Sequence, residues 1–400
     1  MSLTDFKPQF DNAYQEVFQK VLVAKKIANM RFKPTLTYGE SVERVAYDIS
    51  SVRVRNVTRG SASTIDSVTD SSELLTVNIE KEAVLHISDG EAKQAGPLNP
   101  GEVIGGQVAI KVAVDFDGRV LAEVVNATRA FDTGDLTTLS SNGTPITLNS
   151  TTVPQLVTRA PAKLQANNQM LTNLCMVVDS YAASDMSQFL LGKNIDLAGA
   201  VYANGYTGSV SNAEVYVSEN LTGEAVLSMA TQPTDGDTVT IDGVVFTFKT
   251  VLGATAGNVL IGGSADVARA NLAALINDPA TTTANGVALS AADQLVILED
   301  LKLVATNDNT ANTMTIVGTG SGAMVVSETF TDATDAWTKN FIHAYFGKKG
   351  AIDAVMQDLK EVDMRETSDR RGTNVFSSYL AGIKTFADGA KKFLDLKIAR

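Results

Sequence analysis

The first regular pattern along the chain is an apolar stripe at helical spacing near the N-terminus. Its members recur roughly every three or four residues, the periodicity of one helix face: Phe10, Tyr14, Val17, Phe18, Val21, Leu22, Val23, Ile27 and Met30. Basic residues crowd its second half, where they complement the helix dipole, and Pro34 follows. We therefore predict an amphipathic helix over residues 10–31. The pattern leaves open whether this helix docks on its own chain or on a neighbouring subunit.

Alternation of apolar and polar residues follows over residues 35–88 and predicts strands. Residues 52–58 and 74–87 alternate, and the segment between them, residues 60–72, has few large side chains. We predict an extended β-hairpin, which needs a surface to lie against because two strands bury little alone. Its arginines fall near period two and so share one face, which is either solvated or salt-bridged to an acidic neighbour: Arg53, Arg55 and Arg59.

The centre of the chain reads as helices around one short buried strand. Residues 174–178 are continuously apolar, which is typical of a strand buried on both faces. Residues 131–152 are polar and predict a loop or a small hairpin. Helices are predicted over residues 100–128, with a candidate interruption at Asp-Phe-Asp-Gly (115–118), and over residues 153–171 and 181–191.

A Gly-, Thr- and Asp-rich segment over residues 228–338 reads as a β-rich module inserted into another domain. Asp242-Gly243 between two short strands is a strong hairpin signal. Residues 226–338 carry 12 acidic and 3 basic side chains, a net of −9, while the rest of the chain carries 33 and 30. We expect an independently folding module, either immunoglobulin-like or α+β, whose ends lie close together. Its predicted elements are a helix over residues 266–277 and strands over residues 302–307, 313–318 and 323–330.

Composition narrows the class of protein. The 400 residues suffice for two or three domains, and 44% hydrophobic residues are ample for a core. No apolar run is long enough for a membrane-spanning helix, and the N-terminus lacks a signal-peptide pattern. A formal net charge of −12 argues against a nucleic-acid binder that ignores sequence, because such proteins carry a basic excess.

The residues that could carry chemistry form no catalytic pattern. Cys175 is the single cysteine and lies in an apolar strand, where a thiol behaves as a small hydrophobe. His86 and His343 are far apart in the sequence, and we expect structural roles for both. No protease, hydrolase or nucleotide-binding signature is present. We therefore predict no enzymatic activity and no cofactor.

Two further motifs have structural explanations. A GxGxG at residues 318–322 is followed by a strand, so no helix N-terminus follows it to bind a phosphate. Two acidic pairs could bind a divalent cation, but turn formation explains them better, and we predict no metal site: Asp235 with Asp237, and Asp332 with Asp335.

Several phrases carry a resemblance to a known family. They are GKNIDLAGAVYANGYTGSV (192–210), HAYFGKKGAIDAVMQ (343–357) and VDMRETSDRRGTNVFSSYLAGIKTFADGAKKF (362–393). With the order of the predicted elements, they resemble tailed-bacteriophage major capsid proteins of the Hong Kong 97-type fold. Within the segment 228–338, DGDTVTIDGVVFTFKT and NVLIGGSADVARANLAALIN resemble a small module that recurs in phage head proteins.

The resemblance implies an α+β fold with named parts. These are an N-terminal arm (1–36), an extended β-hairpin loop (37–99), a peripheral domain with a long spine helix (100–172 and 373–400), an axial domain (173–227 and 339–372) and the inserted domain (228–338).

The resemblance also implies a function. The chain would be a structural subunit that self-assembles as hexamers and pentamers into an icosahedral virion head around double-stranded DNA. Scaffolding, portal and decoration proteins would be its partners, with no membrane, and synthesis would take place in the bacterial cytoplasm. The chain begins almost at the arm helix, so we expect either a processed N-terminus or a separate scaffold, and we predict no lysine–asparagine cross-link. Inter-subunit contacts would then fall to Phe10, Tyr14, Phe18, Arg53, Arg55 and Arg59.

Two other classes of function stay open at this point. The acidic segment 228–338 favours a head decoration or adhesin-type binding protein as the alternative. A metal-dependent hydrolase using the aspartates of that segment is the third reading, and it lacks converging His, Cys or Glu residues.

Overall fold

The computed structural model describes most of the chain as a mixed α+β protein. The described residues are 22–30, 41–48, 52–56, 59–60, 62, 65–67, 69–88, 100–191, 209–210, 213–366 and 372–400. Three residues proposed for inter-subunit contacts, and most of the predicted 10–31 helix, lie outside them: Phe10, Tyr14 and Phe18. Within residues 22–30 the helix is α2 (Ala24–Ile27).

The described residues fall into two compact units. The first includes Ile27–Val112 and Gly350–Lys391, and the second Leu22–Lys26, Ala113–Lys349 and Lys392–Arg400. The long helix α4 (Pro100–Ala122) contributes to both and continues into a 3-10 turn, η1 (Glu123–Asn126). This agrees with the predicted 100–128 helix, and Asp-Phe-Asp-Gly does not interrupt it. No helix in the described part of the chain is both long and apolar enough to span a bilayer.

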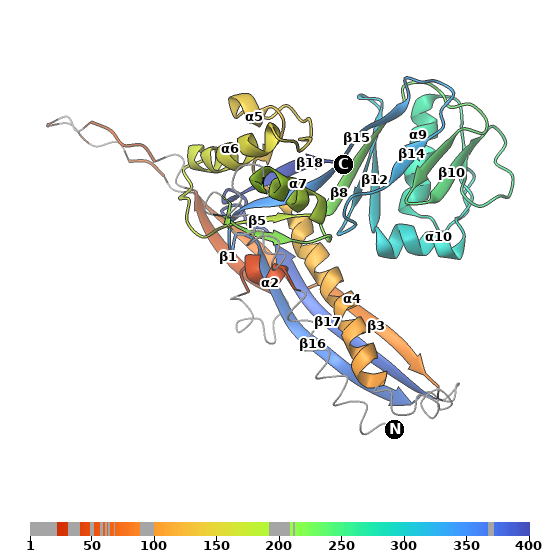
Figure 1. The fold of residues 1–400 in the computed structure, drawn as a ribbon, viewed down its shortest axis with the longest axis horizontal. Helices are drawn as coiled ribbons and strands as arrows, with labels where there is room; N and C mark the ends of the chain where they lie inside the picture. The colour runs from red at the N-terminus through yellow and green to blue at the C-terminus, as the bar shows by residue number, and fades with distance from the viewer. Residues whose placement is uncertain are drawn as a thin grey trace. The chain divides into compact units, whose positions relative to one another are not determined.

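The first unit contains two antiparallel sheets. Strands β16 (Asp353–Glu366), β17 (Thr373–Lys384) and β3 (Ile79–Ile87) form one sheet in the order β16-β17-β3 (Figure 1). Strands β1 (Ser41–Asp48) and β2 (Thr69–Thr76) form the other, a two-stranded hairpin with eight facing pairs of residues.

The structure corrects the predicted hairpin. Its arms are β1 and β2, whereas residues 52–56 form no strand. The predicted strand over residues 74–87 is broken at Val77 and Asn78, and its second part, β3, pairs with β17. An alternating pattern identifies extended backbone and its buried face, but it does not identify the partner strand.

The second unit is built on one large mixed sheet. Among the described residues its order is β12-β13-β8-β15-β5-β7-β6, with β18 paired to β15 and β4 paired to β18. Every residue of β5 (Leu174–Val178) is buried, as the apolar run predicted. The remaining elements are α5 (Asp135–Thr138), α6 (Thr152–Ala166), α7 (Ser180–Leu191), β4 (Ala130–Phe131), β6 (Ser209–Val210), β7 (Ala213–Val217), β8 (Thr222–Ser228), β12 (Leu303–Asp308), β13 (Thr313–Gly318), β15 (Ala336–Lys348) and β18 (Phe393–Ala399).

The segment 228–338 adds a smaller sheet in the order β11-β10-β9-β14. Asp242 and Gly243 have φ values of 46° and 85°, the left-handed backbone that the predicted two-residue hairpin turn requires. Ser264 caps α9 by accepting a hydrogen bond from the Val267 amide. The bounds are β9 (Thr238–Ile241), β10 (Val244–Lys249), β11 (Asn258–Leu260), β14 (Val326–Glu328), α9 (Ala265–Asn277), α10 (Ala291–Leu295) and a π-helical turn, η2 (Val296–Asp300).

This segment is joined to its surroundings by a shared sheet and a shared core. Its strands β12 and β13 extend the large sheet through β8 (Figure 1). Its apolar core includes Ala225 and Leu227 of β8. Ser228 faces Ala336 in the β8–β15 pair, so the two ends are adjacent. With α9 in its core the segment is α+β rather than immunoglobulin-like, and it is less self-contained than expected.

The predicted domain boundary at residues 372/373 needs correction. It falls inside the β16–β17 hairpin, in which Glu366 faces Thr373. Strand β18 does not join that sheet but pairs with β15, from Phe341 facing Ala399 to Gly347 facing Phe393. The chain therefore passes between the units after Lys349 and again after Lys391. The family resemblance implied returning C-terminal strands, but it did not give their partners in the sheets.

Candidate assembly surfaces

The base of the β1–β2 hairpin is packed against its own unit. Leu75 and Val77 are buried with Val355 of β16 and Phe386 in a small apolar cluster. This contact supplies the surface that a two-stranded hairpin needs in order to be stable.

Polar contacts reinforce the same base. The Arg44 guanidinium donates to Asp388 at 2.6 Å and lies over the Phe386 ring, 5.2 Å from its centroid. Gly382 permits a close approach of β17, because a Cβ there would lie 2.6 Å from the carbonyl oxygen of Thr76. These contacts therefore hold the base of the hairpin in place on its unit.

The tip of the hairpin, which is the part between β1 and β2 and includes residues 52–56 and 65–67, presents apolar side chains to solvent. Val54 is 105% exposed and Ile65 is 91% exposed. The tip is held locally by Asp66, which accepts hydrogen bonds from the Arg55 guanidinium at 2.6 and 2.8 Å and from the Arg53 amide at 2.9 Å. The Arg55 hydrogen bonds, with that from the Arg53 amide, lower the pKa of the Asp66 carboxyl. The tip is thus organised while its apolar side chains stay uncovered.

The three loop arginines do not share a strand face. Arg53 and Arg55 lie in a stretch without a strand, and Arg59 lies in a turn. The acidic partner of Arg55 is Asp66 of its own tip. No sequence signal pairs residues 55 and 66, because the connection depends on how the tip folds.

One face of the three-stranded sheet carries mixed charge. Arg365 donates to Asp363 at 2.7 Å, and its guanidinium lies over the Phe376 ring. His86 places Nδ1 2.8 Å from the Asn374 amide oxygen, a structural role of the expected kind. A hollow of about 450 Å³ on this unit is lined by Glu80, Lys81, Glu82, Asp363, Arg365, Phe376 and Ser378.

His343 is the centre of a buried ionic cluster in the large sheet. Its Nδ1 lies 2.9 Å from both carboxylate oxygens of Asp395 on β18, and its Nε2 lies 3.1 Å from Glu224 on β8. Both ring nitrogens face carboxylates, which requires the doubly protonated imidazolium. Burial alone would lower the pKa of His343, but the two carboxylates outweigh it and raise the pKa to about 9. The cluster ties three strands together, with the His343 ring buried and Glu224 partly exposed.

Burial also makes the Cys175 thiol unreactive. Its side chain is fully buried in β5. Burial raises the pKa of the thiol to about 12, so the reactive thiolate does not form near neutral pH. The expected core role fits this environment.

The GxGxG motif makes close backbone contacts rather than a phosphate loop. A Cβ on Gly320 would lie 2.8 Å from the Cα of Gly118 on α4, and Gly320 has a φ of +68°. Beside this contact, Lys302 forms an ion pair with Asp115 of α4 at 2.5 Å. The motif therefore lets the segment 228–338 approach α4 at backbone distance, a purpose that the sequence alone did not reveal.

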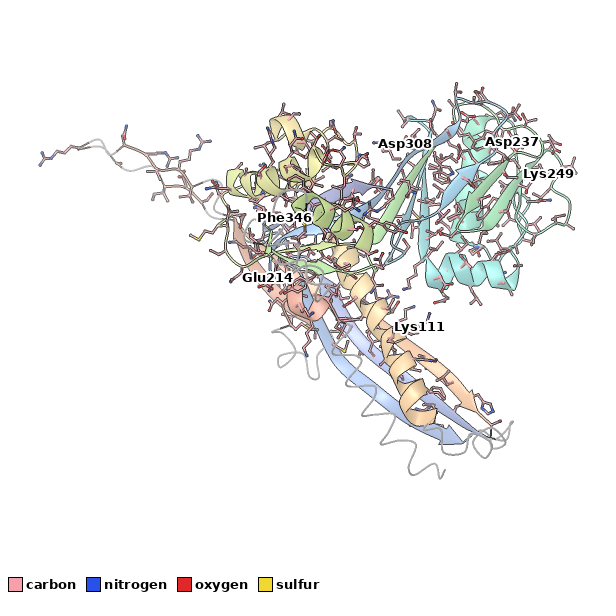
Figure 2. All side chains as sticks on the ribbon, in the orientation of Figure 1. Lys111, Glu214, Asp237, Lys249, Asp308 and Phe346 are labelled. Carbon is pink, nitrogen blue, oxygen red and sulfur yellow. The ribbon has the colours of Figure 1, made fainter. Side chains whose placement is uncertain are left out.

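The aspartate pairs act in turns. Asp237, labelled in Figure 2, accepts hydrogen bonds from the Thr234 amide at 2.7 Å and from the Thr331 hydroxyl at 2.9 Å. Asp335 accepts from the Ala230 amide at 2.8 Å and so links the two ends of the segment. Within the described ranges no three His, Cys, Asp or Glu side chains gather in a metal-binding arrangement. The expected turn roles account for these carboxylates.

The roles of two polar side chains in this segment were not predicted from the sequence. Arg269 of α9 is fully buried and donates to Met229 O and to Asp266, with Nε 3.1 Å from Asn307 Oδ1. Asn277 donates to the carbonyl of Ala305 in β12 and accepts from the Ala305 amide, both at 2.8 Å. Neither position carries a pattern that separates it from an ordinary helix surface residue.

Asp117 anchors the first described residues of the chain. Its buried carboxylate on α4 accepts hydrogen bonds from the amides of Val23 at 2.8 Å and Ala24 at 2.9 Å. Burial raises the pKa of Asp117 to about 6, against the opposing effect of these two amides. Leu22, Ala24 and Ile27 are buried around the same point.

Comparisons with known proteins concern the fold. No protein-family model and no curated protein matches the chain. A chain from Mycobacterium phage Che8 is similar with a TM-score of 0.49 and 13% identity, covering 93% of this chain and 90% of that one. The mature capsid of bacteriophage PhiM1 (TM-score 0.44, 12% identity, 90% and 82% covered) and the capsid of cyanophage P-SCSP1u (0.44, 11%, 90% and 84%) are also similar. The solved structures that resemble this chain thus include phage capsids.

Proposed function

We propose that this chain is the major capsid protein of a tailed bacteriophage with the Hong Kong 97-type fold. In this proposal it acts without enzymatic activity, assembling as hexamers and pentamers into the icosahedral head around double-stranded DNA. The observation that carries the proposal is the β1–β2 hairpin, whose base is packed and whose organised tip exposes Val54 and Ile65.

The hairpin tip has a physical reason to meet another subunit. Exposed apolar area yields about 25 cal/mol per Å² when it is removed from water. Val54 and Ile65 contribute almost none of this free energy in the isolated chain, because both side chains are exposed on the tip. Stable obligate interfaces commonly bury about 2,000 Å² or more, which an extended arm reaches efficiently. A shell subunit is the setting in which such an arm is useful.

The order of elements supports the same proposal. A hairpin loop, a long helix, an α/β body and returning C-terminal strands follow one another as the sequence resemblance implies. We assign β16 and β17 with the first part of α4 to the peripheral domain, and the strands of the large sheet outside residues 228–338 to the axial domain. The arm (1–36), the loop (37–99) and the insert (228–338) keep their predicted bounds as part of this proposal.

The partners follow from the proposed assembly. The main partner is further copies of this chain, and scaffolding, portal and decoration proteins complete the head. The DNA would be enclosed without recognition of its sequence, which suits a chain of net charge −12. The protein would be made in the host cytoplasm and reside in the virion.

The alternative of a decoration or adhesin protein has weaker support. It needs the segment 228–338 to act as a separate binding module, but this segment shares a sheet and a core with β8. We therefore do not extend the proposal to a separate ligand for it.

The test is electron microscopy of the expressed full-length chain with scaffold supplied. We expect rings of five or six, sheets or closed shells in negative stain. A chain that stays strictly monomeric under these conditions would contradict the proposal.

A matched pair of variants tests the role of the tip. Val54→Glu with Ile65→Glu should block assembly while leaving the thermal unfolding of the monomer unchanged, because both side chains are exposed. Val251→Glu, at a site 81% exposed in the segment 228–338, should assemble normally. Normal shells from the double variant would remove the tip from the interface.

A further inference from the structure

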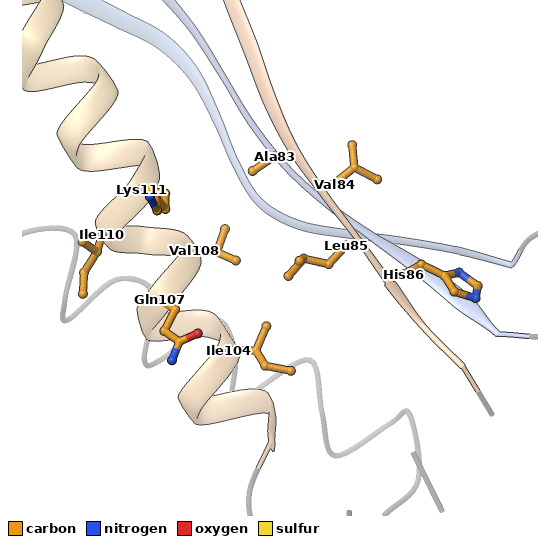
Figure 3. Close-up of a pocket in the computed structure, with 9 residues that line it drawn as sticks. All are labelled: Ala83, Val84, Leu85, His86, Ile104, Gln107, Val108, Ile110 and Lys111. Carbon is orange, nitrogen blue, oxygen red and sulfur yellow. The ribbon is translucent and has the colours of Figure 1, made fainter. Parts of the chain in front are cut away.

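An open apolar groove runs between α4 and β3. Figure 3 shows the residues that line it, and its volume is about 520 Å³. Val84 and Ile110 border it and are 47% and 42% exposed, so each leaves apolar surface in water. The groove is lined by Ala83, Val84, Leu85, His86, Ile104, Gln107, Val108, Ile110 and Lys111.

The polar rim of the groove carries a positive charge at Lys111. Figure 3 places Lys111 and Gln107 on α4 and His86 on β3. The His86 ring is hydrogen-bonded to Asn374, whereas no anionic partner of Lys111 occurs among the described residues. An occupant with an apolar face and an acidic side chain beside it would match this lining.

The chain enters the described structure on the same helix. The amides of Val23 and Ala24 are bound by Asp117 of α4, and Leu22 is buried next to them. Asp117 stands thirteen residues after Ile104 on one continuous helix, roughly 20 Å along its axis. Residues that precede Leu22 therefore start within reach of the groove.

The sequence before Leu22 has the matching chemistry. Residues 10–21, if helical, would be about 18 Å long, close to the stretch of α4 between Asp117 and Ile104. Asp11 falls at the edge of the apolar stripe on the Phe18 side, where it can face a cation on the groove rim. The stripe itself consists of Phe10, Tyr14, Val17, Phe18 and Val21.

We propose that residues 10–21 of the same chain occupy the α4–β3 groove as an amphipathic helix with its apolar stripe facing inward. The same chain is favoured over a second copy because the tether at Asp117 holds the segment beside its groove. Such tethering gives a short linked segment an effective concentration in the millimolar range. Docking on the same chain is one of the two modes that the sequence leaves open.

Site-specific photo-cross-linking tests the occupant. The photoreactive residue p-benzoyl-phenylalanine replaces Ile110 in the full-length, unassembled chain at high dilution, and cross-linked peptides are identified by mass spectrometry. We expect a product of monomer mass that joins residue 110 to the segment 1–21. The control places the same residue at Val304, a site 56% exposed on β12, and should give no such product.

Other products would overturn the proposal. Cross-links of dimer mass would assign the groove to a second copy. Cross-links to residues 89–99 would assign it to the connection between β3 and α4, and the absence of any product with residues 1–21 would leave the segment undocked.

Paired substitutions in the segment give an independent readout. Val17→Asp with Phe18→Asp should speed amide hydrogen exchange in residues 104–111 by about tenfold or more, because it removes the cover. Gln19→Asp changes the opposite helix face and should leave exchange unchanged. Equal exchange in both variants would contradict the docking. Particle formation is measured separately, so shells without the cross-link would refute this inference and leave the proposed function standing.

Discussion

The ionic cluster around His343 should make the stability of this protein fall at alkaline pH. The perturbation is His343→Gln, which keeps a planar polar side chain but removes the charge that Asp395 and Glu224 neutralise. In the wild type both carboxylates stay paired as long as the imidazolium keeps its proton. The variant leaves two buried or half-buried carboxylates without a cation at every pH.

The sign and size follow from the pKa of His343. Folding raises this pKa from an ordinary 6.5 to about 9. The imidazolium therefore contributes stability that is fully present below pH 6.5 and is lost as the pH rises through 9. A shift of about 2.5 units corresponds to roughly 3 kcal/mol.

The assay is urea unfolding of wild type and variant in the unassembled state, between pH 6 and pH 10. The free energy of unfolding of the wild type should exceed that of His343→Gln at pH 6, and the difference should shrink by about 3 kcal/mol towards pH 10. Comparing the two chains at each pH cancels the titration of lysines and tyrosines elsewhere. A difference that stays constant across this range would refute the imidazolium pairing.

Three further predictions concern buried contacts, each measured by urea unfolding. Gly320→Ala adds a Cβ 2.8 Å from the Gly118 backbone and should destabilise the fold by about 1–3 kcal/mol more than Gly236→Ala. Gly236 is the control because it also has a positive φ, +98°, but open space around it, so equal effects would show that the close approach is unimportant. Arg269→Ala should cost about 3 kcal/mol because buried acceptors lose their donor, and a loss no larger than that of Asp266→Ala, at a half-exposed site, would count against this role. Relative to Asp117→Asn, the wild type should gain about 3 kcal/mol of stability as the pH falls from 7 to 4, since folding raises the pKa of this carboxyl from 3.8 to about 6 and protonation favours the fold. A difference between the two chains that stays constant over this range would contradict the raised pKa.

Local patterns were sufficient for much of the secondary structure. Helical periodicity located α4, α6 and α7, and the continuous apolar run located β5. Asp242-Gly243 gave the β9–β10 hairpin because its turn requires left-handed backbone at both positions. These features depend on neighbours within a few residues, which a single sequence displays directly.

Pairings over long distances were not accessible in the same way. The arms of the hairpin and the return of β18 to β15 depend on which strands meet, and alternation looks the same for every partner. The His343 cluster joins residues 52 and 119 positions apart. A structural role for His343 could be expected, but its two carboxylates could not be named. The docking of the N-terminal segment and the inter-subunit role of the arginines remain predictions.

The bond between Asn277 and β12 has a consequence at the concentrations that the proposed shell function would require. A free strand edge recruits other chains through its backbone, and that risk grows with crowding and time. The Asn277 amide supplies both a donor and an acceptor to Ala305, as a neighbouring strand would, and so occupies a central position of this edge. Further strands cannot add there without displacing it. Asn277 thus closes one route to fibrous aggregates at this edge, and Asn277→Ala should reopen that route.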